Sequence, residues 1–425
     1  MRNPWWIPPF LGRVPENLGA PQLRLLGMVA LALLFEEYDS AMLISALKHI
    51  ARDLGMADQD LGLHLGLIRV GALPAFFCVP LADRFGRRPV FLASTIALGV
   101  ITFGTAFVTT PTQFVVLQAL TRTFFVTGTA VAFVIVTEEF PAQHRGWGMG
   151  MLAALGSMGH GLSAILFSQI ERLPFGWRAL YVVGIIPVLC LPAFLRRIPE
   201  TKRFMDMRAG LAAAPVTVFA SVVDPLRMLF ATHPLRALGL AACGFLVAAA
   251  TLPSFQFSGF YTLEKLGWKP GHYSGMVIAG GAVGIIGNIA AGRLGDTFGR
   301  KAVGFVMLAL FPLASFLFYR GSSWVVAVAW VPLVFCFMGG RVVLKALSTE
   351  LFQTSFRSAA AGLFAVMEAM GAVAGMFAVY LYKTEDVLRL ARVVPFVALP
   401  VLGAALLLLL FPETKQRELE EIAAY

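Results

Sequence analysis

Long apolar stretches recur along the chain between residues 25 and 411, and they restrict its fold more than any other feature. The hydrocarbon core of a bilayer is about 30 Å thick, so a helix needs about 20 mostly apolar residues to cross it. Twelve stretches come close to that length. They cover residues 25–47, 61–82, 89–108, 112–137, 147–169, 179–195, 237–262, 271–292, 302–319, 324–349, 358–382 and 393–411. The pattern predicts an all-α integral membrane protein with twelve transmembrane helices.

The composition excludes a soluble protein. Of the 425 residues, 58% are hydrophobic and only 14% are charged, which leaves too little polar surface to cover a folded chain in water. The segment 1–22 lacks the apolar core of a cleavable signal peptide. All four cysteines fall within the predicted spans, so we expect small buried hydrophobic residues, no disulfide, no metal and no cofactor. They are Cys78, Cys190, Cys243 and Cys336.

The net charge of +10 is distributed in the way expected for a membrane protein. If the N-terminus is cytoplasmic, the loops on that side carry about twice as many lysines and arginines as the outer loops. This bias predicts that both termini are cytoplasmic, in a plasma or inner membrane, and that the basic excess faces membrane lipid. We therefore expect no nucleic acid partner. No feature of the chain requires an oligomer, and a monomer is expected.

Two sequence patterns occur once in each half of the chain. The pattern LADRFGRRPVF around Asp83 returns as GRLGDTFGRKAVG around Asp296. The pattern TEEFPAQHRG returns as TELFQTSFRS, which aligns Glu138 with Glu350 at almost the same separation along the chain. Two unrelated patterns with a shared offset indicate a duplication, and hence two six-helix pseudo-symmetric bundles. The predicted domains are an N-terminal bundle (1–195), a cytoplasmic linker (196–236) and a C-terminal bundle (237–425).

These patterns resemble those of a known family. The sequence D-R-x-G-R-R after the second span, repeated after the eighth, resembles the signature of the major facilitator superfamily of secondary transporters. PETKRF after the sixth span, PETKQREL after the twelfth and E-x-x-P-x-x-x-R-G from Glu138 resemble its sugar-porter and related metabolite-transporter branches. The resemblance covers nearly the whole chain. It implies secondary transport of a small molecule by alternating access.

The resemblance to the sugar porters weakens in the seventh span. That span usually carries Q-Q-x-S-G-x-N, whereas FQFSGF keeps only Gln256, Ser258 and Gly259. The lost hydrogen-bonding positions argue against a sugar. FEEYD in the first span is more similar to the acidic signature of aromatic-acid and related organic-acid proton symporters.

The charged residues of the repeated patterns are predicted to form a cytoplasmic gate. Their ion pairs would hold the inner face closed in one state and separate in the other as the two halves rock. The alternative is a solvated positive-inside cluster. The predicted gate residues are Asp83, Arg87, Arg88, Glu138, Arg145, Asp296, Arg300, Lys301, Glu350 and Arg357.

Charges inside the first and fourth spans point to proton coupling. An ionised carboxylate at the bilayer centre costs roughly 2.5 to 3.5 kcal/mol, so such acids are functional by default. An acid that faces an arginine stays ionised, and one that loses this partner takes up a proton. We predict Asp39 or Glu36 as the proton-coupling group, with Arg122 as its partner. A static ion pair and a countercharge for a cationic substrate are the alternatives.

Further polar residues inside the spans are predicted to bind the substrate. An arginine fork matches a carboxylate, so Arg341 with Lys345 and Glu368 would suit an organic anion. A structural Arg341–Glu368 pair, with Lys345 reaching the inner interface, is an equally good interpretation. His160 is either a proton relay or a packed residue. The other predicted substrate-binding residues are Glu37, Tyr38, Arg69 and Gln256.

No enzymatic motif is visible. The chain lacks a G-x-x-x-x-G-K-[ST] loop, an H-E-x-x-H pair and a nucleophile elbow. The sequence therefore predicts a secondary transporter that moves a small organic metabolite together with protons, with an organic acid favoured over a sugar. A proton-driven exporter of amphipathic or cationic compounds and a facilitative uniporter are the alternatives. A sensor is disfavoured because no soluble signalling domain is attached.

Overall fold

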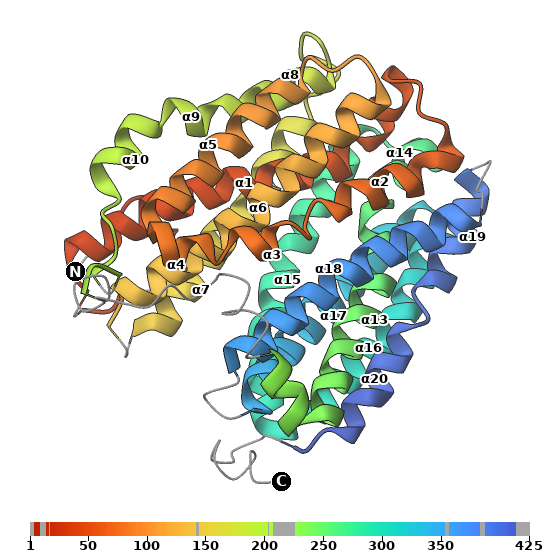
Figure 1. Ribbon diagram of the computed structural model, residues 1–425. Helices are drawn as coiled ribbons and strands as arrows, with labels where there is room; N and C mark the ends of the chain where they lie inside the picture. Colours follow the sequence, from red (N-terminus) through yellow and green to blue (C-terminus); the bar gives the residue numbers. More distant parts are fainter. Residues whose placement is uncertain are drawn as a thin grey trace. The chain divides into compact units, whose positions relative to one another are not determined.

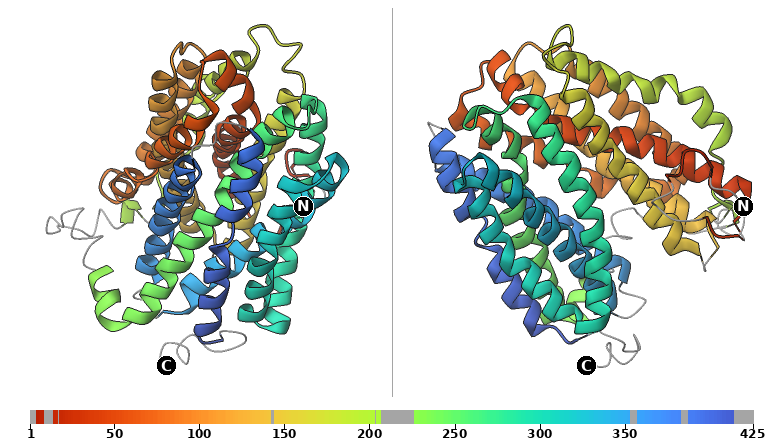
Figure 2. Two further views of the ribbon diagram at one scale, coloured as in Figure 1. Left: turned by 90° about the vertical axis from the view of Figure 1, so that its right-hand side faces the viewer. Right: turned by 180° about the vertical axis from the view of Figure 1, so that it is seen from behind.

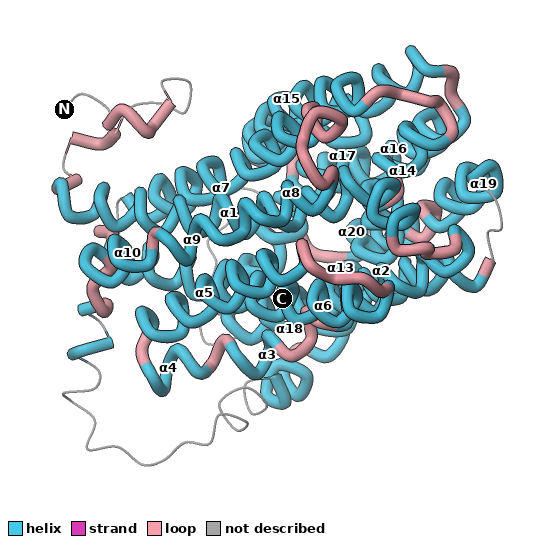
Figure 3. The backbone as a smooth tube through the Cα atoms, turned by 90° about the horizontal axis from the view of Figure 1, so that it is seen from above, coloured by secondary structure: helices cyan, strands magenta, loops and turns pink. Residues whose placement is uncertain are grey.

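The computed structural model describes residues 4–8, 14–16, 18–141, 144–202, 204–206, 226–352, 357–382 and 387–413. Within these ranges all regular structure is helical and no strand occurs (Figure 3). Ten segments of this described part are helical, long and apolar enough to cross a membrane. Two further helices, α1 and α15, contain 34 and 29 residues and supply the remaining two spans. The predicted fold class is confirmed.

The helices follow the predicted spans along the chain. In the first half they are α1 (Ala20–Asp53), α2 (Leu61–Val70), α3 (Ala75–Cys78), α4 (Leu81–Phe85), α5 (Arg87–Thr105), α6 (Pro111–Glu139), α7 (Arg145–Phe167), α8 (Trp177–Val182), α9 (Ile186–Leu189) and α10 (Leu191–Arg197). In the second half they are α13 (Pro234–Gln256), α14 (Ser258–Glu264), α15 (Pro270–Phe298), α16 (Arg300–Arg320), α17 (Ser323–Glu350), α18 (Arg357–Leu381), α19 (Val387–Val397) and α20 (Val401–Leu410).

Prolines accompany the breaks that divide several spans into shorter helices. Pro74 and Pro80 lie immediately before α3 and α4, so the second span consists of α2, α3 and α4. Pro187 and Pro192 lie in the first turns of α9 and α10 in the sixth span. Pro253 precedes the break between α13 and α14. Proline lacks an N–H donor and clashes with the preceding turn. Membrane helices tolerate such breaks where neighbouring groups satisfy the freed carbonyls.

A glycine with positive φ occupies the same place in each repeat. Gly86, with φ of 106°, joins α4 to α5, and Gly299, with φ of 102°, joins α15 to α16. Residues with a Cβ rarely adopt this conformation. The glycine of the D-R-x-G-R-R pattern therefore allows one helix to end and the next to begin within a single residue.

The cysteines differ in their burial. All four are free thiols. Cys243 and Cys336 are buried as expected, whereas Cys78 and Cys190 are partly exposed. The expectation of four buried cysteines was therefore wrong for the two that lie in the proline-broken second and sixth spans.

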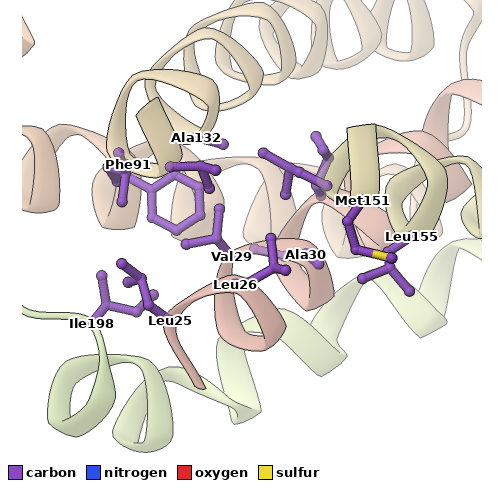
Figure 4. Packing of buried hydrophobic residues seen from close by; sticks show 14 of the residues in the cluster. Leu25, Leu26, Val29, Ala30, Phe91, Ala132, Met151, Leu155 and Ile198 are labelled. Atoms are coloured by element: carbon purple, nitrogen blue, oxygen red, sulfur yellow. The ribbon is translucent and has the colours of Figure 1, made fainter. Parts of the chain in front are cut away.

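The chain divides into two compact units. The first unit comprises Met1–Ser45 with Pro74–Val218. Within it, α5 packs along α6 and against α8 and α9, and α6 packs against α7 (Figure 1). Its buried core joins the first half of α1 to α5, α6 and α7, and Figure 4 shows Val29 near Phe91 and Ala132. This core holds the α1 helix that carries the acidic residues.

The second unit comprises Ala46–Leu73 with Phe219–Tyr425. Its α13 packs against α18 and α20, while α17 packs against α15 and α16 (Figures 1 and 2). The α2 helix packs on α18 in the same unit. Small residues permit the closest approach, since a Cβ on Gly371 or Gly375 of α18 would collide with the backbone of Phe245 or Ala249 of α13.

Candidate functional site

The carboxylates of α1 reach three neighbouring helices of the first unit. Glu36 contacts α6, Glu37 contacts α7 and Asp39 contacts α5. Successive residues of an α-helix are rotated by about 100°, so Glu36 and Glu37 diverge while Asp39 returns toward the side of Glu36. The acidic motif (residues 35–39) thus connects α1 to α5, α6 and α7.

Glu36 is completely buried against α6. Its Oε2 accepts a hydrogen bond from the Thr129 hydroxyl at 3.0 Å, whereas its Oε1 has no partner among the described residues. Gly128 makes room for this oxygen, because a Cβ on that glycine would lie 2.5 Å from Oε1. The absence of a second donor is unusual for a buried carboxyl group.

Asp39 has a richer set of partners than Glu36. It is 4% exposed, and its Oδ1 accepts a hydrogen bond from the Thr102 hydroxyl of α5 at 2.9 Å. The guanidinium of Arg122 attracts Asp39 electrostatically. The structure therefore brings Arg122 together with Asp39, while Glu36 relies on a hydroxyl.

Arg122 is itself buried on α6. It interacts electrostatically with Asp39 and Glu37, and its Nη1 donates to the Ser40 hydroxyl at 3.5 Å. Its guanidinium carbon lies 4.9 Å from the ring centre of Phe125, in cation–π contact. Both carboxylates that attract Arg122 thus come from α1.

The other side chains of the acidic motif lie on different sides of α1. Oε2 of Glu37 lies 3.6 Å from Nδ1 of His160 on α7, and both side chains are partly exposed. Tyr38 is buried, and its hydroxyl donates to the Leu180 carbonyl at 2.8 Å. The Tyr38 hydroxyl is therefore engaged with α8, whereas the Glu37–His160 pair is accessible.

In the second unit, one basic residue of α2 and two at the end of α1 pair with polar residues of the seventh span. Arg69 donates to Oε1 of Gln256 at 2.7 Å, and the buried Nε2 of Gln256 has no partner among the described residues. Lys48 and Arg52 lie 3.1 Å and 2.7 Å from Glu264. Sequence reasoning missed Glu264, because nothing near it in the chain indicates that it meets the end of α1.

A second ion pair of this unit joins α17 to α18. Nε and Nη2 of Arg341 donate to the two carboxylate oxygens of Glu368 at 3.1 and 3.3 Å. The guanidinium carbon lies 5.3 Å from the ring centre of Phe337 on the same helix. Lys345, one turn further along α17, is exposed.

Two of the predicted gate residues of the first unit form a largely buried ion pair. Arg87 contacts Oε1 of Glu138 at 3.1 Å through its Nη2, and the Thr201 hydroxyl donates to Oε2 at 2.6 Å. Arg88 instead donates to the Leu195 carbonyl at 2.6 Å. The structure thus brings the α5 motif together with α6 and with the segment after α10.

Sequence reasoning missed the acids that cap α5 and α16. Glu200 accepts hydrogen bonds from the backbone N–H groups of Arg87 and the following residue at 3.0 and 3.2 Å. Glu413, its counterpart in the second repeat, accepts from the N–H groups of Arg300 and Lys301 at 2.9 and 3.3 Å. The signal for these roles was present, since both acids belong to the repeated PET sequences.

The side chains of the remaining predicted gate residues lie outside the described part of the chain, and their roles stay predictions. They are Asp83, Arg145, Asp296, Glu350 and Arg357.

Replacing either capping acid with glutamine is expected to destabilise its own unit. Glu200→Gln and Glu413→Gln each remove a negative charge from a helix N-terminus, which costs about 1 kcal/mol. Thermal unfolding of the purified protein in detergent should show a lower Tm for both variants. Glu171→Gln, at an exposed position, is the matched control. Unchanged Tm values for both capping variants would contradict the assigned caps.

Comparisons with known proteins agree with this architecture. The model of the Major Facilitator Superfamily matches residues 29–294 and 260–423. The niacin transporter NiaP of Acinetobacter baylyi is 23% identical over 438 residues, covering 96% of this chain and 98% of that protein. A gallate transporter of Pseudomonas putida is 24% identical over 389 residues, covering 84% and 85%. The inward open structure of the xylose transporter XylE from E. coli has a TM-score of 0.73 at 17% identity, covering 94% and 99%.

The family model spans both halves of the chain, and the two sequence relatives are membrane transporters rather than enzymes. The prediction that this chain is an integral membrane transporter and not an enzyme is confirmed. The chain belongs to the major facilitator superfamily.

Proposed function

We propose that this transporter of small organic metabolites carries an organic acid together with a proton, by symport with alternating access. The observation that carries the proposal is the buried Asp39, which accepts a hydrogen bond from Thr102 and is attracted by the Arg122 guanidinium. An acid in this setting is ionised while the cation is near and takes up a proton when the cation moves away. Both residues belong to the first unit, so a shift of α1 against α6 that accompanies the rocking of the two halves would alternate these two conditions.

The choice of an organic acid has support from two sources. The named sequence relatives transport niacin and gallate, and both compounds carry a carboxylate. In the second unit, the Arg341 guanidinium offers the forked donors that recognise carboxylates. A sugar would need several hydroxyl partners, and the seventh span supplies only Gln256 and Ser258 of the usual set.

The proposed orientation follows the basic loops. Both termini would be cytoplasmic in a plasma or inner membrane. The N-terminal bundle (1–195), the linker (196–236) and the C-terminal bundle (237–425) would form one chain that acts as a monomer. The Arg87–Glu138 pair and the helix caps at Glu200 and Glu413 would then belong to the cytoplasmic gate.

The test is substrate-driven proton movement in proteoliposomes. Parent protein should acidify the vesicle interior faster than protein-free liposomes when benzoate or niacin is added outside, and Asp39→Asn should abolish this excess. Counterflow exchange of labelled substrate should persist in Asp39→Asn, because exchange needs no net proton transfer. Asp53→Asn, at the exposed end of the same helix, is the matched control and should retain acidification.

Other outcomes would assign other functions. Uptake of an acid without proton movement would indicate a uniporter and return Asp39 to a structural or substrate-binding role. Movement of cationic compounds in exchange for protons would indicate an exporter. Acidification that persists in Asp39→Asn would shift the coupling role to another carboxylate, with Glu36 next to be tested.

A further inference from the structure

We infer that Glu368 is a resident anion that occupies the carboxylate-binding site of Arg341 and is displaced there by an aromatic acid. The inference rests on the proposed transport of an organic acid. It adds the place where the acid is held and the class of acid that fits. The same contacts also allow a permanent structural ion pair, so the two interpretations must be separated by geometry and by experiment.

The Arg341–Glu368 pair has the geometry of a bound ligand carboxylate. Nε donates to Oε1 and Nη2 to Oε2 of Glu368, but Nη2 also lies 3.1 Å from Oε1. The pair is thus a skewed form of the bidentate arrangement in which arginine recognises planar carboxylates. The lengths of the two hydrogen bonds, 3.1 and 3.3 Å, exceed the about 2.7 to 2.9 Å of strong charge-assisted hydrogen bonds. Glu368 therefore departs from the ideal bidentate geometry, which a free carboxylate can adopt.

The pair is also more open than the Arg87–Glu138 pair of the first unit. The side chains of Arg341 and Glu368 are 34% and 17% exposed, whereas those of Arg87 and Glu138 are 8% and 10% exposed. Charged groups within a membrane span face protein or a water-filled cavity rather than lipid. A partly exposed guanidinium at this position is therefore reachable by a solute from water.

Aromatic side chains stand next to the guanidinium. The Arg341 guanidinium carbon lies 5.3 Å from the ring centre of Phe337, which in turn lies 4.5 Å from the ring centre of Phe255 on α13. Phe255 is partly exposed. An acid whose ring bears the carboxylate directly would place that ring beside these side chains, where aromatic pairs add about 0.5 to 1.5 kcal/mol. An aliphatic acid would gain less, so the site favours a planar aromatic acid.

The displaced glutamate has a second cation nearby. Lys345 follows Arg341 by four residues on α17, and residues with this spacing lie about 5 to 6 Å apart on one helix face. Glu368 can thus move from Arg341 to Lys345 without losing a positive neighbour. The exchange leaves the carboxylate of Glu368 beside a positive charge.

The test is binding of benzoate to purified protein, measured by titration calorimetry, with benzamide as the uncharged analogue of the same shape. If Arg341 is free of Glu368 about one-tenth of the time, Glu368→Gln should bind benzoate about tenfold more tightly. Benzamide affinity should not change in this variant. Arg341→Gln should lose benzoate binding, and cyclohexanecarboxylate should bind the parent more weakly than benzoate.

If Arg341 and Glu368 form a permanent structural ion pair, the variant Glu368→Gln should not bind benzoate more tightly. Glu368→Gln would then leave benzoate affinity unchanged or weaken it and would lower the Tm, and the double variant Arg341→Gln/Glu368→Gln would recover the Tm lost by either single change. That result would overturn the inference. Parent protein that acidifies vesicles with benzoate but shows no tightening in Glu368→Gln would overturn only this inference. Parent protein that neither binds nor moves any carboxylate would overturn the proposed function as well.

Discussion

Replacing Arg122 with glutamine is expected to lower substrate uptake by at least about 100-fold, because the buried Asp39 would lose the cation that attracts it, and a buried charge left without compensation costs about 3 to 5 kcal/mol. Asp39 would keep its hydrogen bond from Thr102 but lose the cation that attracts it. The Phe125 ring would lose its cation–π contact at the same time. Uptake of labelled benzoate, normalised to protein in the membrane, is the measurement.

The double variant Arg122→Gln/Asp39→Asn separates folding from coupling. With both charges removed, no uncompensated charge of this pair stays buried, and the amount of folded protein should recover. Substrate-driven proton movement should stay absent, because the titrating group is gone. Arg122→Lys keeps the charge without the planar fork and should lie between parent and Arg122→Gln. Normal uptake by the single variant Arg122→Gln would show that this arginine is dispensable for transport.

Most of the fold could be predicted from the sequence because its main determinants are local. The length and spacing of apolar runs define the spans, since each must cross a hydrocarbon core of fixed thickness. The recurrence of the Asp83 motif around Asp296 indicates the duplication. Local reasoning did not locate where the second span breaks. Pro74 and Pro80 mark the places, but whether proline bends or ends a membrane helix depends on its neighbours.

The sequence predicted how deep the residues of the candidate site lie in the membrane. It did not always predict which of them pair with one another. Arg341 and Glu368 could be expected to meet, because a helix rises by about 1.5 Å per residue and the depth of both residues is counted from the same end of the bundle. Whether Arg122 faces Asp39 or Glu36 could not be derived, since the two acids differ by less than one turn. That choice depends on the rotation of α1 against α6, which Gly128 beside Glu36 helps to set.

The helix caps show what long-range contacts add. Glu200 reaches the start of α5 from the end of the sixth span, 113 residues along the chain. The repeated PET sequences indicated that their glutamate has a role in each repeat, but no local pattern predicts which helix Glu200 caps. Glu413 and Arg300 repeat the contact at the same separation, so the internal repeat could have suggested a shared role without specifying it.

The second prediction with a large expected effect on uptake concerns the close contact between α7 and α1. Gly159→Ala is expected to lower uptake by about tenfold or more, because misplacing a functional group by about 1 Å can cost that much. A Cβ at this position would collide with the Leu34 carbonyl and lie 2.7 Å from the Tyr38 nitrogen. These are backbone atoms of the acidic segment, so they cannot rotate away and α7 must shift. The shift would separate His160 from Glu37, which now lie 3.6 Å apart.

The sign of the stability change distinguishes this clash from a general effect of alanine. Alanine is a better helix former than glycine by about 1 kcal/mol, whereas overpacking costs about 1 to 3 kcal/mol. Gly161→Ala, two residues further along α7, meets no atom within 4 Å and should raise the Tm slightly with uptake unchanged. Gly159→Ala should lower the Tm and the uptake together. If both variants behaved alike, the close approach of α7 to α1 would not be what positions the acidic motif.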